Sequence, residues 1–186
     1  MATRTRNHTR PRSPSQQPKK KSADVVKFMV TGLSQSGKTS FIKTMSQYTE
    51  WQNEPGKSWF FGRVRVDDSL ILHFYEPPMD RQFDFMWLRD IMGRMRATGF
   101  IVMADSTRPQ DFGQFLSILY TVRGFHASMP IIVAANKQDS SRAWSAEDIE
   151  LGLGLRDFTV IPCIANEYDT VRDIVVELLY QVLNIN

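Results

Sequence analysis

A glycine-rich stretch between two predicted elements constrains the fold of this chain more than any other feature. It follows residues 25–31, whose β-branched and apolar side chains predict a buried strand, and it reads Gly32-Leu33-Ser34-Gln35-Ser36-Gly37-Lys38-Thr39. Residues 40–45, which come next, are compatible with a helix. A strand, the pattern Gly-x-x-x-x-Gly-Lys-Thr and a helix in this order are the context of a phosphate-binding loop.

The residue types of this loop suit a phosphate ligand. Gly32 and Gly37 allow the backbone to turn inward, so that successive N–H groups face phosphate oxygens beside the positive end of the following helix. We expect Lys38 to contact the β- and γ-phosphates and the Thr39 hydroxyl to coordinate Mg²⁺. The predicted nucleotide-binding residues of the loop are Gly32, Ser34, Gln35, Ser36, Gly37, Lys38, Thr39 and Ser40.

Apolar strands and amphipathic helices alternate along the rest of the chain. This alternation predicts an α/β fold of three layers, a P-loop NTPase fold with a mostly parallel six-stranded sheet, one antiparallel edge strand and helices on both faces. Asp67 and Asp68 indicate a tight hairpin that supplies the antiparallel strand. The expected strands are residues 25–31, 59–66, 69–75, 99–105, 130–135 and 158–163, and the expected helices include residues 40–45, 85–95, 112–119 and 171–182.

A second polar motif, Asn136-Lys137-Gln138-Asp139, directly follows a predicted buried strand. In such a fold, ligands bind just past the carboxyl ends of the strands. A carboxylate at Asp139 can accept hydrogen bonds from N1–H and the 2-amino group of guanine, whereas adenine would leave it unpaired at a cost of ~1–3 kcal/mol. Asn136 is suited to bracing neighbouring loops, and the Lys137 stem to lying over the ring of the base.

Charge is distributed unevenly along the 186 residues. Residues 1–22 carry seven Arg and Lys and no acid, which leaves 16 bases and 20 acids, a net charge of −4, in the rest of the chain. The first segment has too little apolar surface to fold, so we expect a disordered basic tail over residues 1–22 and one domain over residues 23–186. A solvated leader, weak contact with anionic membranes, loose nucleic-acid binding and docking of an acidic partner are the open interpretations of the tail; specific nucleic-acid binding is not expected.

Composition narrows the class of protein further. Hydrophobic residues make up 42% and charged residues 23%, which is ordinary for a globular domain, and no uncharged apolar run approaches the ~18 residues of a membrane span. The single cysteine, Cys163, excludes an internal disulfide framework. We expect a cytoplasmic protein, with the inner membrane surface as its peripheral location if the tail contacts lipid.

With both motifs in place, residues 25–183 resemble a small GTPase of the Ras superfamily. Residues 32–39 match the family's phosphate loop and residues 136–139 its guanine-specificity loop, while residues 163–165 stand where a further loop contacts the base. The resemblance implies base contacts from Ile164 and Ala165, and a switch that binds GTP or GDP with Mg²⁺. Residues 72–75 and 83–87 are similar to the bacterial gliding-motility (Mgl-type) and Arf-like branch. This similarity implies a protein regulator or effector, with an activator of Roadblock type.

The segment after the third predicted strand departs from the family pattern. Where switch II normally reads Asp-x-x-Gly-Gln, or Thr-Pro-Gly-Gln in the bacterial branch, this chain has Glu76-Pro77-Pro78-Met79-Asp80. Met79 replaces a hinge glycine and Asp80 replaces the glutamine that orients the attacking water. Glu76 can still hold Mg²⁺ through water, so the predicted catalytic residues are Lys38 and Glu76 and the predicted metal ligands are Thr39 and Glu76. For the Mg²⁺ ligand of switch I, Thr49 and Ser58 are the candidates.

Three functions are compatible with these residues. The first is a switch that hydrolyses GTP slowly and depends on a partner to supply the missing catalytic group. The second is a non-hydrolysing pseudo-GTPase, an interaction or scaffold protein that uses the nucleotide as a structural cofactor. The third, a P-loop kinase, is disfavoured because Asn136 to Asp139 indicate guanine and because Arg89, Arg94 and Arg96 fall on a predicted helix instead of an arginine-rich lid.

Overall fold

A computed structural model describes residues 22–54, 57–78, 96–125 and 128–185 of the chain. Several predictions made from the sequence lie outside these residues. They concern the basic tail up to residue 21, the helix at residues 85–95, and the switch II and arginine positions Met79, Asp80, Arg89 and Arg94.

The described strands form one mixed sheet in the order β2-β3-β4-β1-β5-β6-β7. β1, β4, β5, β6 and β7 run parallel, and β3 is antiparallel to both of its neighbours. The bounds are β1 (Asp24–Gly32), β2 (Tyr48–Glu54), β3 (Lys57–Arg65), β4 (Leu70–Glu76), β5 (Gly99–Asp105), β6 (Ile131–Asn136) and β7 (Thr159–Cys163). The α/β prediction is therefore confirmed.

The sheet has seven described strands, so the expectation of six was wrong. The additional strand is β2, which pairs with β3 and forms the edge, so the antiparallel strand β3 is second from the edge. β2 reads Tyr-Thr-Glu-Trp-Gln-Asn-Glu, and its Tyr48 and Trp51 remain exposed. An edge strand need not bury either face completely, so its sequence lacks the apolar run that marked the central strands.

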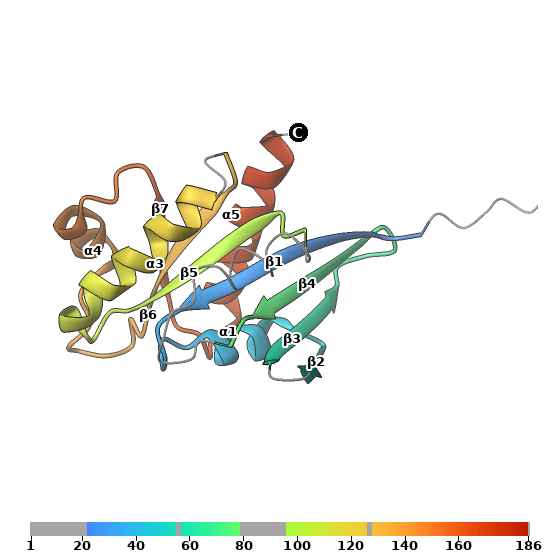
Figure 1. Ribbon diagram of the computed structural model, residues 1–186, viewed down its shortest axis with the longest axis horizontal. Coiled ribbons are helices and arrows are strands. Elements are labelled where there is room, and N and C mark those ends of the chain that lie inside the picture. The colour runs from blue at the N-terminus through green and yellow to red at the C-terminus, as the bar shows by residue number, and fades with distance from the viewer. Residues whose placement is uncertain (1–21, 55–56, 79–95, 126–127, 186) are drawn as a thin grey trace, which may run out of the picture.

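Helices cover both faces of the sheet (Figure 1). α1 (Lys38–Met45) and α5 (Tyr168–Ile185) pack on one face, where Phe41, Ile42 and Leu178 join a buried cluster with side chains of β1, β3, β4, β5 and β6. α3 (Phe112–Phe125) and Ile149 of α4 (Ala146–Leu153) belong to the cluster on the opposite face. In the part of the chain that the structure describes, no helix is both long and apolar enough to cross a membrane.

The parallel strands bring the predicted motifs to one side of the sheet, the side at which the carboxyl ends of these strands lie. β1, β4, β5, β6 and β7 share one direction, so their carboxyl ends, and the loops that follow, lie at the same side. Gly32 ends β1, Glu76 ends β4, Asp105 ends β5, Asn136 ends β6 and Cys163 ends β7. The residues at these strand ends therefore lie along one side of the sheet although they are far apart in the sequence.

Candidate functional site

The loop between β1 and α1 depends on its two glycines. Gly32 has φ +139° and Gly37 has φ +102°, values that side chains rarely allow. A Cβ on Gly32 would lie 2.4 Å from the Met103 carbonyl oxygen, and one on Gly37 would lie 2.1 Å from Asn136 Nδ2. The glycines therefore serve both the turn and the close approach of the loop to β5 and β6.

Asn136 joins three loops at this edge of the sheet. Its Nδ2 donates a 2.8 Å hydrogen bond to the Ser36 carbonyl oxygen, and its Oδ1 accepts a 2.9 Å bond from the backbone N–H of Ala165. The Ala165 carbonyl oxygen accepts a further bond from Thr44 Oγ1 of α1, at 2.7 Å. Asn136 is 3% exposed, so this bridge is shielded from water and holds the phosphate loop against the loops that follow β6 and β7. Asn136, for which the sequence suggests a bracing role, thus makes side-chain hydrogen bonds to the loops that follow β1 and β7.

Lys38 is a buried cation at the start of α1. Its side chain is 6% exposed, its Nζ donates a 2.8 Å hydrogen bond to the Leu33 carbonyl oxygen, and the same Nζ lies 3.7 Å from Glu76 Oε1. Burial lowers the pKa of the Lys38 ammonium, an effect that the nearby Glu76 carboxylate partly offsets. The phosphate loop thus directs a largely desolvated positive charge toward the end of β4.

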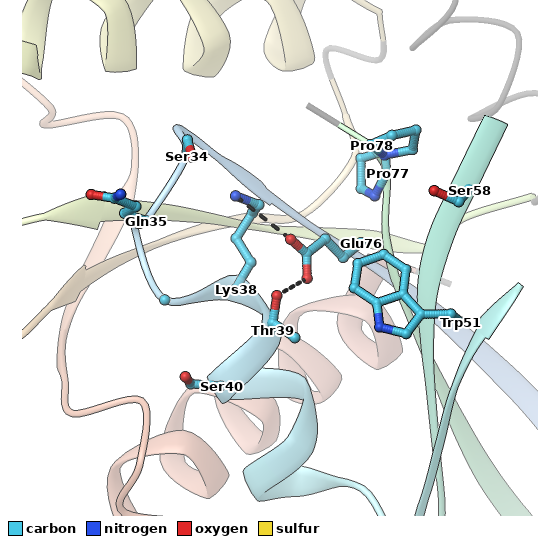
Figure 2. Close-up of a pocket in the computed structure, with 11 residues that line it drawn as sticks. Ser34, Gln35, Lys38, Thr39, Ser40, Trp51, Ser58, Glu76, Pro77 and Pro78 are labelled. Carbon is cyan, nitrogen blue, oxygen red and sulfur yellow. Dashed lines mark hydrogen bonds and ion pairs between the residues drawn. The ribbon is translucent and has the colours of Figure 1, made fainter. Parts of the chain in front are cut away.

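Glu76 lies between Lys38 and Thr39. Thr39 Oγ1 donates a 2.6 Å hydrogen bond to Glu76 Oε2, while Oε1 faces the lysine. Figure 2 shows both side chains of α1 pointing toward the carboxylate that extends from β4. The cluster offers a hydroxyl and a carboxylate, oxygen ligands of the kind that Mg²⁺ prefers, so the residues present fit the metal.

A cavity of about 490 Å³ opens beside this cluster. Trp51 from β2 and Ser58 from β3 form the wall opposite the phosphate loop, and Pro77 and Pro78 continue from Glu76 (Figure 2). The lining residues are Ser34, Gln35, Gly37, Lys38, Thr39, Ser40, Trp51, Ser58, Glu76, Pro77 and Pro78.

The remaining predicted site residues do not line this cavity. Ser36, within the phosphate loop, is completely buried, and no partner of its Oγ appears in the described part of the chain. Asp139 is exposed past the end of β6, and Ile164 and Ala165 follow β7. Thr49, one candidate for the switch I ligand, pairs with Gly62 inside the β2–β3 ladder and does not line the cavity, whereas Ser58 does.

Sequence reasoning did not assign Trp51 or Asp105 to the site. Trp51 is 57% exposed, and its ring centroid lies 5.1 Å from that of Phe60, which holds the indole beside the cavity. Asp105 ends β5 in register with Asn136, and its Oδ2 accepts a 2.5 Å hydrogen bond from Lys137 Nζ. A carboxylate at the carboxyl end of a predicted strand was the available signal for Asp105, because such ends converge on the ligand in parallel sheets.

A family comparison agrees with this arrangement. The family model of the ADP-ribosylation factors (Arf) matches residues 15–182, which is most of the chain. This chain belongs to the Arf family. It is accordingly a GTP-binding domain of the small GTPase class, as its phosphate loop and its guanine-specificity motif predicted.

Among solved structures, the Arf-family chain is similar to the G domain of the iron transporter FeoB from T. maritima. The two chains are 19% identical with a TM-score of 0.63, and the match covers 87% of this chain and 99% of the other. This similarity concerns the fold, which is that of a G domain. Comparison with curated proteins gives no significant match.

Proposed function

We propose that this chain is a guanine-nucleotide switch that binds GTP and GDP with Mg²⁺, hydrolyses GTP slowly and depends on a protein partner for faster turnover. The observation that carries the proposal is the cluster of Lys38, Thr39 and Glu76 at the cavity. A buried lysine, a hydroxyl and a carboxylate meet there next to a loop that turns at two glycines with positive φ. That combination suits a triphosphate with its metal ion.

The nucleotide would lie along the edge of the sheet where these loops meet. Backbone N–H groups of residues 32–39 and the start of α1 would receive the phosphates, and Lys38 would neutralise the β- and γ-oxygens. Asp139 would accept hydrogen bonds from the guanine edge, with Lys137 beside the ring and with Ile164 and Ala165 on its other side. Through its bonds to Ser36 and Ala165, Asn136 would keep the phosphate and base halves of this site at a fixed separation.

Thr39 and Glu76 would hold the metal ion. Ser58 is the third candidate oxygen donor, because it lines the same cavity from β3 while Thr49 does not. Bound Mg²⁺ neutralises phosphate charge during phosphoryl transfer. The chain's own contribution is to fix Glu76 through its Thr39 and Lys38 contacts, so that the carboxylate is positioned before the metal arrives.

Slow hydrolysis follows from the segment after Glu76. Pro77 and Pro78 line the cavity, and their rings restrict the backbone where the family has a hinge. Asp80, beyond the described residues, replaces the glutamine that would orient water. A carboxylate near the γ-phosphate is repelled and cannot donate a hydrogen bond as an amide does. We therefore propose an activator that supplies the water-orienting group in trans, of Roadblock type if the chain belongs to the Mgl-like branch.

A second candidate function is a nucleotide-stabilised scaffold without turnover. The same two prolines favour it, because a stiffened loop would not relax when the γ-phosphate is lost.

For the basic tail over residues 1–22 we propose weak contact with anionic lipid, and for the whole chain a cytoplasmic location that is peripheral at the inner membrane surface. Removing the tail should then lower co-sedimentation with anionic vesicles.

One experiment separates the two candidate functions. Bound nucleotide is extracted from the purified chain and quantified by chromatography, and single-turnover hydrolysis of GTP is then followed with Mg²⁺. The switch predicts slow turnover that Lys38→Ala abolishes and that Lys43→Ala, an exposed lysine on the same helix, leaves unchanged. Tight binding without turnover would support the scaffold, and absence of guanine-nucleotide binding would overturn both.

A further inference from the structure

Two consecutive strands present an aspartate and a lysine to each other beside the proposed base site. β5 and β6 are adjacent and parallel (Figure 1), and Asp105 at the end of β5 is in register with Asn136 at the end of β6. Lys137 is the next residue, and its Nζ donates a 2.5 Å hydrogen bond to Asp105 Oδ2. The lysine of the guanine-specificity motif therefore has a specific carboxylate partner.

The Asp105 carboxylate is itself held in place from its other side. Its Oδ1 accepts a 3.0 Å bond from the backbone N–H of Thr107 and a 2.7 Å bond from Thr107 Oγ1. Its side chain is only 7% exposed. Burial alone would raise the pKa of Asp105, but the hydrogen bonds from Lys137 and Thr107 and the charge of Lys137 outweigh burial and lower it. The carboxylate is thus an ionised, fixed acceptor and not a mobile surface group.

The loop that contains Lys137 is attached to the same segment by a second contact. Gln138 Nε2 donates to Ser106 Oγ at 2.9 Å and to the Trp144 carbonyl oxygen at 2.9 Å. Lys137 itself has φ +71°, a left-handed conformation that is unfavourable for a residue with a side chain. Such a conformation persists only when surrounding contacts impose it, and it is most common at functional sites.

We propose that Asp105 is a positioning residue for nucleotide binding, which holds the Lys137 side chain across the base site before the guanine nucleotide binds. This inference rests on the proposed function. A free lysine has several rotatable bonds, and immobilising such a side chain on binding costs about 0.5–1.5 kcal/mol of affinity. The ion pair with Asp105 anchors the ammonium in advance, so that the methylene stem offers an apolar surface to the ring of the base. Pairing also offsets the charge of a lysine that faces an uncharged base.

The test is a double-mutant cycle on nucleotide affinity with the full chain. Variants Asp105→Asn, Lys137→Met and the double variant are compared with the unaltered chain, and dissociation constants for GDP and GTP are measured. We expect Asp105→Asn to weaken both nucleotides by about tenfold, a typical size for coupled contacting groups, and to have almost no further effect in the Lys137→Met background. A merely structural role for Asp105 would give the same loss in both backgrounds, which would overturn the proposal.

Asp111→Asn is the matched control. Asp111 follows β5 in the same loop, and its carboxylate pairs with Arg108 at 2.7 Å instead of with Lys137, so its loss should leave the affinity unchanged. Should Asp105→Asn not fold, Thr107→Val removes one bond to the carboxylate and retains its charge; we expect a loss of about two- to threefold that again disappears in the Lys137→Met background. Unchanged affinity in Asp105→Asn or Thr107→Val would refute the positioning role alone, whereas failure of the unaltered chain to bind guanine nucleotide would refute the proposed function.

Discussion

Thr39 Oγ1 and Glu76 Oε2 lie 2.6 Å apart, joined by a hydrogen bond between residues that are 37 positions apart in the sequence. The bond links the first turn of α1 to the end of β4, and so connects the phosphate loop to the strand that neighbours β1. The side chain of Glu76 is 13% exposed, which means that its charge is largely shielded and is balanced by Lys38 at 3.7 Å. The carboxylate thus belongs to the phosphate loop's own network.

Replacing Glu76 with glutamine should weaken the binding of Mg²⁺ to the complex of the chain with its nucleotide. Glutamine retains an acceptor for Thr39 but loses the negative charge that a divalent cation requires. In Glu76→Gln we expect the Mg²⁺ concentration that half-maximally slows GDP release to rise by about ten- to a hundredfold. Release of a fluorescent GDP analogue, followed over a Mg²⁺ titration, measures this directly.

Glu50→Gln is the control for this charge change. Glu50 also accepts side-chain hydrogen bonds, from Tyr48 and Gln52, but it is on β2 and does not line the cavity. The Mg²⁺ titration of Glu50→Gln should superimpose on that of the unaltered chain. An unchanged titration in Glu76→Gln would show that Glu76 does not contribute to metal binding.

The Gly37→Ala variant should unfold at a lower temperature and bind nucleotide poorly. The new methyl group would lie 2.1 Å from Asn136 Nδ2, and the backbone would keep a φ of +102° that alanine does not favour. We expect a loss of at least about 2 kcal/mol in the free energy of unfolding, which corresponds to a decrease of ~4–8 °C in Tm for a domain of this size. Differential scanning calorimetry measures the change.

The Gly113→Ala variant should instead be more stable than the unaltered chain. Gly113 is in the first turn of α3, and an added Cβ would meet nothing within 4 Å. Because alanine loses less conformational entropy than glycine in a helix, the free energy of unfolding should rise by about 0.5–1 kcal/mol. Equal effects of the two alanines would mean that the close approach of Gly37 to Asn136 is not a stability determinant.

The central strands could be predicted from the sequence because both of their faces are buried. Met29, Val102 and Val133 are completely inaccessible, and a strand buried on both sides needs the continuous apolar run that the sequence contains. The phosphate loop could also be predicted, because its glycines, lysine and threonine stand at fixed spacing. The edge strand β2 lacks such a signal, because Trp51 and Tyr48 remain exposed and its other residues are polar.

The contacts between distant residues could not be predicted in the same way. That Asp105 meets Lys137 depends on the register of β5 against β6, which places Asp105 beside Asn136. A shift of that register would separate the two charges without changing the hydrophobic pattern of either strand. The choice of Ser58 over Thr49 as a cavity residue likewise depends on where β2 ends and β3 begins.

Cys163 should be unreactive while the chain is folded. Burial raises the pKa of its thiol to about 12, so at pH 8 the reactive thiolate is roughly a thousandfold rarer than in an unfolded chain with an ordinary thiol. Because this is the only cysteine of the sequence, labelling with a thiol reagent reports on it alone. We expect labelling at pH 8 to be slow in buffer and fast in denaturant; rapid labelling in buffer would support a redox-sensing role instead.

The same thiol has a predictable effect on stability at alkaline pH. Above about pH 9 the unfolded chain loses the thiol proton, while the folded chain retains it up to about pH 12. The unfolded state then binds fewer protons, so the contribution of Cys163 to the free energy of unfolding falls as pH rises through this interval. Urea titrations give the free energy of unfolding at pH 8 and at pH 10. This free energy should fall more between the two pH values in the unaltered chain than in Cys163→Ala. An equal fall in both would contradict the raised pKa.

Guanine specificity is the most direct test of the loop after β6. Asp139 is exposed past the end of that strand, so Asp139→Asn should leave the Tm unchanged and alter only the ligand. The amide can no longer accept from both N1–H and the 2-amino group of guanine, and GTP affinity should fall by about a hundredfold or more. Xanthine carries a carbonyl in place of the amino group, and the amide N–H can donate to it, so xanthosine triphosphate should become the preferred ligand.

Competition of GTP, ATP and xanthosine triphosphate against a fluorescent nucleotide shows which of the three each variant binds most tightly. Asp157→Asn, an exposed aspartate in the loop between α4 and β7, is the control and should retain the preference for GTP. If Asp139→Asn still favours GTP, the base is not recognised by this loop, and the nucleotide lies elsewhere along the sheet edge. If it favours xanthosine triphosphate, the base is placed beside Asp139, the position at which the Asp105–Lys137 pair can act on it.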